Sequence, residues 1–212
     1  MTSSGLFKTS GAVLMLAAVA FAVAEFISLS IFADQGEDYD LGQIARSGTF
    51  FLQSLLTLIA GILLLGGLVG IYLGQAQDAG RLGFIGFLLA FFGTALGVDD
   101  FYASTFVTPM VAQGAPAFLE DPLSIVLQLW SPFSFGLIAL SWLVFAVATV
   151  RARVYPRAPS WLLLIGAVVA VVPFPLAKIP FYAAVGWKGL RLLRARDVAA
   201  IGSRSRSEAR RR

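Results

Sequence analysis

One acidic residue stands apart from the others because it interrupts a long apolar run. Glu25 lies 14 residues into the run 11–33, which contains no other charge. An ionisable group at such depth in a membrane is costly, so it usually faces other helices or a water-filled cavity. We therefore treat Glu25 as a candidate proton or cation site. Two alternatives stay open: a hydrogen-bonded tie between helices, and a side chain that reaches the outer interface.

A second candidate site consists of Asp99 and Asp100 with Tyr102, joined by Glu120 and Asp121. Carboxylate oxygens suit hard cations such as calcium or magnesium, so this set could bind a cation at the outer mouth of the protein. Adjacent residues of a helix point about 100° apart, so the two aspartates do not automatically form a pair. The alternative is a helix end that meets water, and we predict no metal site.

The chain lacks the residues on which most enzyme sites depend. It has no cysteine and no histidine, which removes thiolate chemistry, the common zinc ligand and the usual proton shuttle at neutral pH. It contains no GxSxG, SxxK, P-loop, Rossmann or HExxH motif. We therefore expect a protein that is not an enzyme and has no cofactor.

Composition and the length of the apolar runs indicate a membrane protein. Of the 212 residues, 58% are hydrophobic and 13% are charged, whereas soluble domains carry about 25% charged residues. A membrane-spanning helix needs about 20 apolar residues. The fold class we predict is an all-α polytopic helical bundle. It forms one transmembrane domain, residues 1–195, followed by a basic and disordered tail, residues 196–212.

Glycines repeat along two of the apolar runs at spacings that place them on one helix face. They are Gly66, Gly70 and Gly74 in the second run and Gly86, Gly93 and Gly97 in the third. Such faces let a neighbouring backbone approach closely. Only 75–81 separate the two runs. We predict an antiparallel hairpin in which the two glycine faces pack against each other.

The charges between the apolar runs alternate in sign, and this predicts the threading. Segments 34–49 and 99–121 are acidic, whereas 151–160 and the tail from Lys188 are basic. Basic segments stay in the cytoplasm. A tail on that side requires two crossings within 161–194, with prolines at 173, 175 and 180 near the turn. We predict six spans with both termini cytoplasmic; five spans are the alternative.

Two segments allow rival interpretations. Residues 1–24 could be a signal peptide, with Lys8 in its basic region, 11–21 as its apolar region and a cleavage site at the small residues of 22–24. However, 26–33 continues the apolar run, so we favour a retained helix. Residues 122–130 are predicted to form a short interfacial helix anchored by Trp130, before a fourth span over 132–150. The alternative is one long helix from residue 123, kinked at Pro132.

The remaining bases have simpler interpretations. Lys178 is expected to snorkel at an interface, or to pair with an outer acid or a lipid phosphate. The basic residues that begin the tail could contact anionic lipid headgroups; they are Lys188, Arg191, Arg194 and Arg196. The tail has no interleaved aromatic residues that would stack on bases, so we expect no nucleic-acid binding.

Three motifs occur in the second half of the chain: the string at 106–109, the basic Pro-Arg turn at 153–157 leading to 161–166, and Gly186-Trp187-Lys188-Gly189-Leu190. Through them, roughly residues 100–195 resemble a group of uncharacterised six-spanning bacterial and archaeal membrane proteins of unknown function. The resemblance implies six spans and a prokaryotic plasma membrane, and it implies no catalytic residue. The Pro-rich turn at 173–180 is shorter than in that group.

These observations favour a multi-pass, non-enzymatic membrane protein of accessory or scaffold type. Its partners would be the lipid bilayer and either another membrane protein or a second copy of the chain. The alternative is a small transporter or channel for a proton or cation that uses Glu25 and the acidic outer mouth. A third, weaker hypothesis is an enzyme that acts on lipid. A transporter requires a water-accessible cavity that reaches Glu25, whereas a scaffold requires a closed core.

Overall fold

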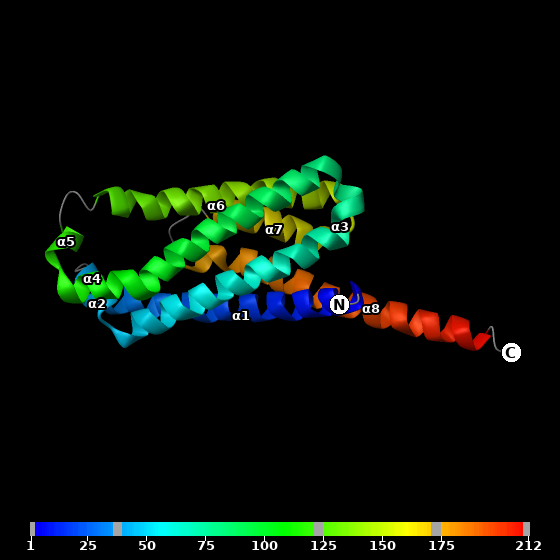
Figure 1. Ribbon diagram of the computed structural model, residues 1–212, viewed down its shortest axis with the longest axis horizontal. Coiled ribbons are helices and arrows are strands. Elements are labelled where there is room, and N and C mark those ends of the chain that lie inside the picture. Colours follow the sequence, from blue (N-terminus) through cyan, green and yellow to red (C-terminus); the bar gives the residue numbers. More distant parts are fainter. Residues whose placement is uncertain (1–2, 36–39, 121–124, 171–174, 210–212) are drawn as a thin grey trace.

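The computed structural model describes residues 3–35, 40–120, 125–170 and 175–209, and every regular element in these ranges is helical. In chain order they are α1 (Ser3–Gln35), α2 (Leu41–Ala45), α3 (Gly48–Tyr102), the π-helical turn η1 (Ala103–Val107), α4 (Thr108–Gly114), α5 (Ala117–Glu120), α6 (Ile125–Ala152), α7 (Arg157–Val169), the 3₁₀ turn η3 (Pro175–Lys178) and α8 (Ile179–Ala209). Figure 1 shows a bundle of long helices from which α8 projects at one end. The end from which α8 projects is called the tail end. The opposite end, which contains α2, α4 and α5, is called the distal end.

Helix α3 folds back on itself at Gly80. This residue has φ 55° and ψ −150°, a conformation that only glycine adopts readily, and it separates a first limb (48–79) from a second limb (81–102). The limbs are antiparallel: Tyr72 stacks on Phe87 with ring centroids 4.4 Å apart, and Gly61 faces Phe101. The predicted hairpin is therefore confirmed.

The predicted packing of glycine face against glycine face is wrong. In the first limb, Gly70 faces Ser10 of α1 and Gly74 faces Tyr155. The second limb turns its glycines toward α6, where Gly86, Gly93 and Gly97 meet Phe145, Ser141 and Ile138. Gly66 faces open space. Glycine spacing marks a face that admits a close neighbour but does not say which neighbour, and here α1 and α6 take those places on either side of the hairpin.

Helix α6 differs from expectation near the distal end. It runs without interruption from Ile125 to Ala152, so the chain forms the long helix rather than a separate interfacial helix. Beyond α3 the chain stays helical through η1 and α4. The turn η1 widens to a π-helix, in which Thr108 N–H bonds to the Ala103 carbonyl. Pro109 explains the widening, because it has no N–H to continue the α-helical ladder.

The last helices form a short hairpin packed against α1. Helix α7 has only 13 residues, and Gly166 lets it approach the backbone of Phe181 in α8. Helix α8 crosses α1 where Gly11 and Gly189 meet backbone to backbone. Helix α8 then continues to Ala209, so most of the segment expected to be disordered is helical; arginine and alanine are good helix formers.

Helix α1 is an integral part of the core. Leu14 and Phe21 lie before the candidate cleavage site, Glu25 lies after it, and all three are buried. Phe145 and Trp142 of α6 and Leu68 of α3 complete the centre of the bundle. This packing is what a retained first helix predicts.

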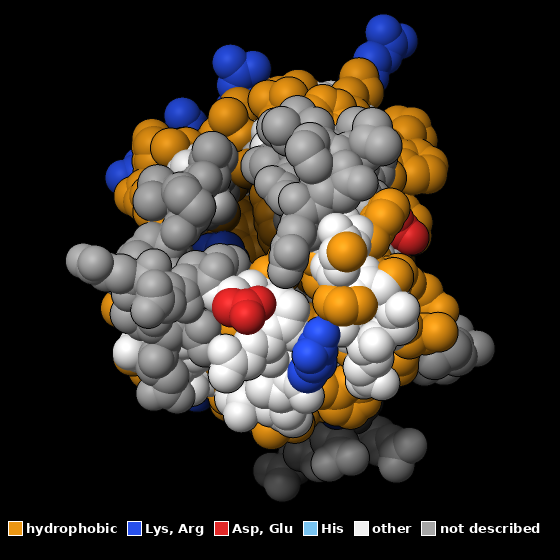
Figure 2. Space-filling model, turned by 90° about the vertical axis from the view of Figure 1, so that its left-hand side faces the viewer, with side chains coloured by type: hydrophobic (Ala, Val, Ile, Leu, Met, Phe, Trp, Pro, Cys, Tyr) orange, Lys and Arg blue, Asp and Glu red, His pale blue; other side chains and the backbone are white. Residues whose placement is uncertain are grey.

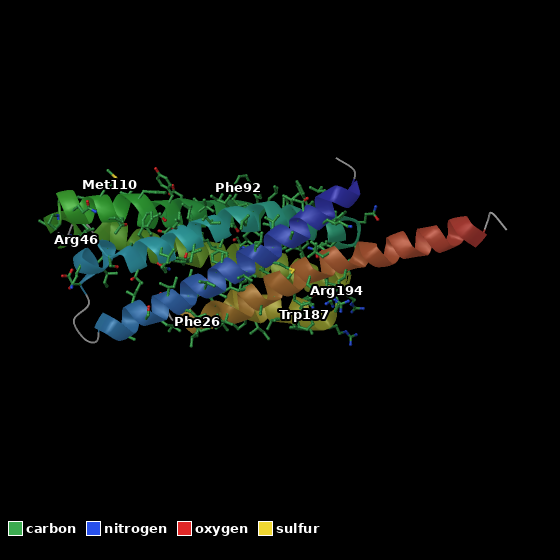
Figure 3. All side chains as sticks on the ribbon, turned by 90° about the horizontal axis from the view of Figure 1, so that it is seen from below. Phe26, Arg46, Phe92, Met110, Trp187 and Arg194 are labelled. Atoms are coloured by element: carbon green, nitrogen blue, oxygen red, sulfur yellow. The ribbon has the colours of Figure 1, made fainter. Side chains whose placement is uncertain are left out.

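The outer surface of the bundle is apolar along its length. Within the part of the chain that the structure describes, three helical stretches are long and apolar enough to cross a membrane: Gly5–Ile31, Gly48–Gly114 and Phe133–Ala152. The second of these contains the bend at Gly80. Figure 3 shows Phe26, Phe92, Met110 and Trp187 pointing away from the bundle, and they are 42–72% exposed. Lipid is the environment that such a surface requires. The protein is therefore a polytopic helical membrane protein.

Candidate functional site

Glu25 is held in a buried ion pair. Its Oε1 atom lies 3.1 Å from the ammonium nitrogen of Lys178 and accepts a hydrogen bond of 2.9 Å from the Tyr182 hydroxyl. Both Glu25 and Tyr182 are only 7% exposed, and the Lys178 side chain is 28% exposed. Residues more than 150 positions apart in sequence thus form one polar cluster, which we name the Glu25 cluster.

The positions of these side chains follow from two pairs of residues, each spaced one helical turn apart, on segments that face each other. Phe21 and Glu25 are four residues apart on α1, so they share one face. Lys178 and Tyr182 are also four residues apart, across the junction of η3 and α8. The rings of Phe21 and Tyr182 stack in parallel with centroids 4.7 Å apart, which fixes the Tyr182 hydroxyl beside the carboxylate. Lys178 additionally lies 5.4 Å from the centroid of Phe135.

A polar pocket of about 170 Å³ adjoins the Glu25 cluster and contacts both Lys178 and Tyr182. This is several times the ~30 Å³ share of one water molecule. Its polar lining comes from both limbs of α3 and from η1: Gln53, Ser54, Thr57, Asp100 and Ser104. Figure 2 looks onto the distal end, which is hollowed and carries acidic, basic and other polar side chains among hydrophobic ones.

The pocket lies in the distal half of the bundle. Leu14 meets Gly67 and Ser10 meets Gly70, so the antiparallel register of α1 and the first limb brings Glu25 level with the turn that contains Thr57. The hairpin formed by α7, η3 and α8 is short. Lys178 is the last residue of η3, directly before α8, where the chain runs back toward the tail end. The polar lining supplied by Gln53 and Ser54 lies farther toward the distal end than Glu25.

A second pocket, apolar and of about 70 Å³, lies next to the polar one. The two share Phe101, Phe135, Lys178 and Tyr182. The apolar pocket continues to Trp142, whose indole N–H donates to the Thr94 hydroxyl at 2.9 Å. The shared residues therefore separate a polar compartment from a largely apolar one.

The structure distinguishes the two aspartates that sequence analysis grouped. Asp100 is half-buried and lines the polar pocket, whereas Asp99 is exposed. They do not act as a carboxylate pair, and no cluster of three acids that could hold a metal ion occurs among the residues that the structure describes. Asp121 lies outside these residues, as does the side chain of Glu120.

Glu25 could be identified from the sequence, but its partners could not. Lys178 pairs with Glu25 rather than snorkelling or joining the acids of the outer loops. Tyr182 carried no signal, because a tyrosine in an apolar run looks like a core residue. A usable signal did exist: Glu25 and Lys178 are opposite charges that the alternating pattern left unexplained, and two such charges within a membrane stabilise each other by pairing.

The basic residues at the tail end divide into exposed and buried ones. Arg191 and Arg194 are exposed, and Figure 3 shows Arg194 pointing away from the bundle. Lys188 is fully buried, with its ammonium 4.1 Å from the centroid of the Tyr155 ring. The predicted contact of Lys188 with lipid headgroups is therefore wrong. The side chain of Arg196 lies outside the described part of the chain.

Tyr155 forms the contact surface for Lys188. It lies in the turn between α6 and α7, and its hydroxyl donates to the Ile71 carbonyl at 3.1 Å. Burial raises the pKa of the Tyr155 phenol well above its ordinary value, so the hydroxyl remains a donor.

Comparison with known proteins finds no matching family model, no matching curated protein and no matching solved structure. The resemblance to six-spanning prokaryotic membrane proteins therefore stays a prediction. Function must be argued from the site itself.

Proposed function

We propose that the protein is a non-enzymatic, six-span membrane protein that binds and conducts a small cation or proton through the polar pocket. The observation that carries this proposal is that the pocket ends on Lys178 and Tyr182, the two partners of Glu25. A polar cavity beside a buried ion pair suits a transporter, and a scaffold has no need of it.

The charges at the pocket support a cation as the ligand. Glu25 and Asp100 contribute two negative charges and Lys178 one positive charge, so these three residues carry a formal net charge of −1. A single monovalent cation entering the pocket would neutralise the site. It would compete with the Lys178 ammonium for Glu25, and the 28% exposure of that lysine leaves it room to move aside into the pocket.

Ion flux into liposomes tests the proposal. The full-length protein is reconstituted, and uptake of protons, Na⁺ and K⁺ is measured separately with ion-sensitive dyes against empty liposomes. We expect Glu25→Gln to abolish flux of the conducted ion and Asp100→Asn to lower it several-fold. Asp99→Asn is the matched control, because it removes the same charge from the exposed neighbour, and it should conduct normally.

Two results would overturn the transport proposal. One is the absence of flux above empty liposomes for all three ions. The other is wild-type flux in Glu25→Gln, provided that the variant elutes as a folded protein. The amide oxygen of the introduced glutamine would still accept the hydrogen bond from Tyr182, so the variant should fold.

The six-span threading is supported by where the last hairpin reaches. Lys178 contacts Glu25, which lies 17 residues beyond Lys8 on α1, a rise of about 26 Å. The hairpin of α7 and α8 therefore reaches across most of a hydrocarbon core about 30 Å thick. The tail end also holds most of the described basic side chains, against a single described acid, Asp78; they are Lys8, Arg81, Arg151, Arg153, Arg157, Lys188, Arg191 and Arg194. The excess of basic residues favours a cytoplasmic tail end at the plasma membrane of a prokaryote.

Cysteine labelling checks the threading in this cysteine-free chain. Ser205→Cys should be protected from a membrane-impermeant maleimide in intact cells, and Asp40→Cys should be labelled. Labelling of both positions from outside would leave five spans as the better description.

The accessory or scaffold role remains a second candidate because of one feature of α3. Gly66 is exposed and faces open space, and Ile59, Ile62 and Leu73 are exposed near it on the same limb. A small residue within an apolar face permits close packing by another transmembrane helix. Crosslinking through Gly66→Cys in membranes would detect such a partner or a second copy of this chain.

A further inference from the structure

The turn between α6 and α7 forms another pocket, at the tail end and away from the Glu25 cluster. Its volume is about 750 Å³, and its charged lining consists of Arg151, Arg153 and Arg157. All three arginines are exposed, and no acid lines this pocket among the described residues. Three like charges within seven residues repel one another, so an anion bound among them would stabilise the turn.

The backbone of the turn holds these arginines in an unusual arrangement. Arg153 has φ 55°, in the left-handed region that residues other than glycine rarely adopt. Tyr155 follows it and is buried, anchored by its hydrogen bond to the Ile71 carbonyl. This anchored tyrosine lies between Arg153 and Arg157 in the sequence and also lines the pocket.

A buried lysine lies behind the pocket. Lys188 is fully buried, its ammonium has no hydrogen-bond partner among the described groups, and it lies 4.1 Å from the centroid of the Tyr155 ring. Guanidinium groups bind phosphate oxygens in a bidentate manner, which makes phosphate the fitting anion.

The surface beside the pocket indicates that the phosphate belongs to a lipid. Trp161 lines the pocket and is 52% exposed, and tryptophan favours the headgroup level of a membrane. Ile165 and Val168 follow on the same face of α7 and are 51% and 54% exposed. An apolar stripe that starts at an arginine pocket and runs along a membrane helix suits an acyl chain below a phosphate headgroup.

We propose that this pocket is a binding site for one anionic phospholipid, with its phosphate held by Arg151, Arg153 and Arg157 and an acyl chain lying along Trp161, Ile165 and Val168. The excess of positive charge favours a headgroup with net negative charge over a zwitterionic one. Placing this lipid in the cytoplasmic leaflet rests on the proposed threading, whereas the binding chemistry does not.

Native mass spectrometry of the full-length protein in detergent tests the site. The protein is titrated with phosphatidylglycerol and, separately, with phosphatidylcholine of the same acyl chains. We expect phosphatidylglycerol to bind at least 10-fold more tightly. The triple variant R151Q/R153Q/R157Q should lose this preference. The control R204Q/R206Q/R210Q removes the same charge from the tail and should keep it.

Competition distinguishes a lipid from a free anion. Millimolar inorganic phosphate should leave the phosphatidylglycerol complex intact, because it cannot use the apolar stripe. Displacement by phosphate alone would overturn the lipid assignment in favour of a free-phosphate site. An equal loss of preference in the tail control would overturn the pocket.

A single variant keeps the test decisive should the triple variant unfold. Arg157→Gln should weaken phosphatidylglycerol binding several-fold without changing phosphatidylcholine binding. Unchanged phosphatidylglycerol binding in that variant would count against the proposal. No arm of this experiment depends on ion conduction, so the two proposals stand or fail separately.

Discussion

Replacing Lys178 with methionine would leave the Glu25 carboxylate buried without its cation. Methionine keeps much of the length and apolar character of the lysine stem near Phe135. Removing one partner of a buried ion pair typically costs about 3–5 kcal/mol, because the other charge stays uncompensated. The polar pocket can solvate part of this site, and Lys178 itself is 28% exposed. We therefore expect the free energy of unfolding to fall by about 2–3 kcal/mol, slightly below that range.

The reciprocal substitution should cost less. Glu25→Gln retains an oxygen that accepts the hydrogen bond from Tyr182, and Lys178 can then turn toward the pocket. A loss of about 1 kcal/mol is expected, the usual net value of one polar interaction. The double variant Glu25→Gln with Lys178→Met removes both charges, so it should also lose only about 1 kcal/mol, which gives a coupling energy of about 2–3 kcal/mol.

Unfolding in mixed micelles with increasing sodium dodecyl sulfate, followed by far-UV circular dichroism, measures all three variants on one scale. Two outcomes would refute the reasoning. Lys178→Met could prove no more harmful than Glu25→Gln, which would mean that the carboxylate is well solvated without the lysine. Alternatively, the double variant could lose the sum of the two single effects, which would mean that the residues do not interact.

Two further predictions use the same unfolding assay. Gly166→Ala should cost more than about 2 kcal/mol, because its new Cβ would lie within 2.6 Å of the backbone of Phe181, which cannot move aside. Gly66→Ala is the control, since nothing lies within 4 Å, and stabilities in the opposite order would contradict the packing of α7 on α8. Tyr155→Phe should lower the free energy of unfolding by about 1 kcal/mol, because the hydrogen bond to the Ile71 carbonyl is lost. Tyr155→Leu should lower it further, because Lys188 then also loses its contact with the aromatic ring. Equal losses in these two tyrosine variants would show that the contact with Lys188 contributes nothing.

The helices and the first hairpin could be predicted because the bilayer imposes length and composition on each span. Gly80 could be placed near the turn because a polar linker of only seven residues, 75–81, must reverse the chain. The partners of the glycine faces could not be predicted. Each face specifies that a neighbour comes close, while the identity of the neighbour depends on how α1 and α6 flank the hairpin. The course of α6 through Pro132 was ambiguous for a similar reason, since proline tolerates both a helix start and a helix interior in membranes.

The depth of Lys178 explains why its role was missed. The sequence pattern places the proline-rich turn at the outer interface, where a lysine would snorkel to water. In the structure α8 begins at Ile179, directly after the lysine that contacts Glu25, and so well inside the end of α1 at Gln35. Because α7 has only 13 residues, the chain turns back early, and the turn brings Lys178 to the buried carboxylate of Glu25. If the hairpin were lengthened by a full turn, Lys178 would pass beyond Glu25, and the polar pocket would lose the ion pair on which it ends.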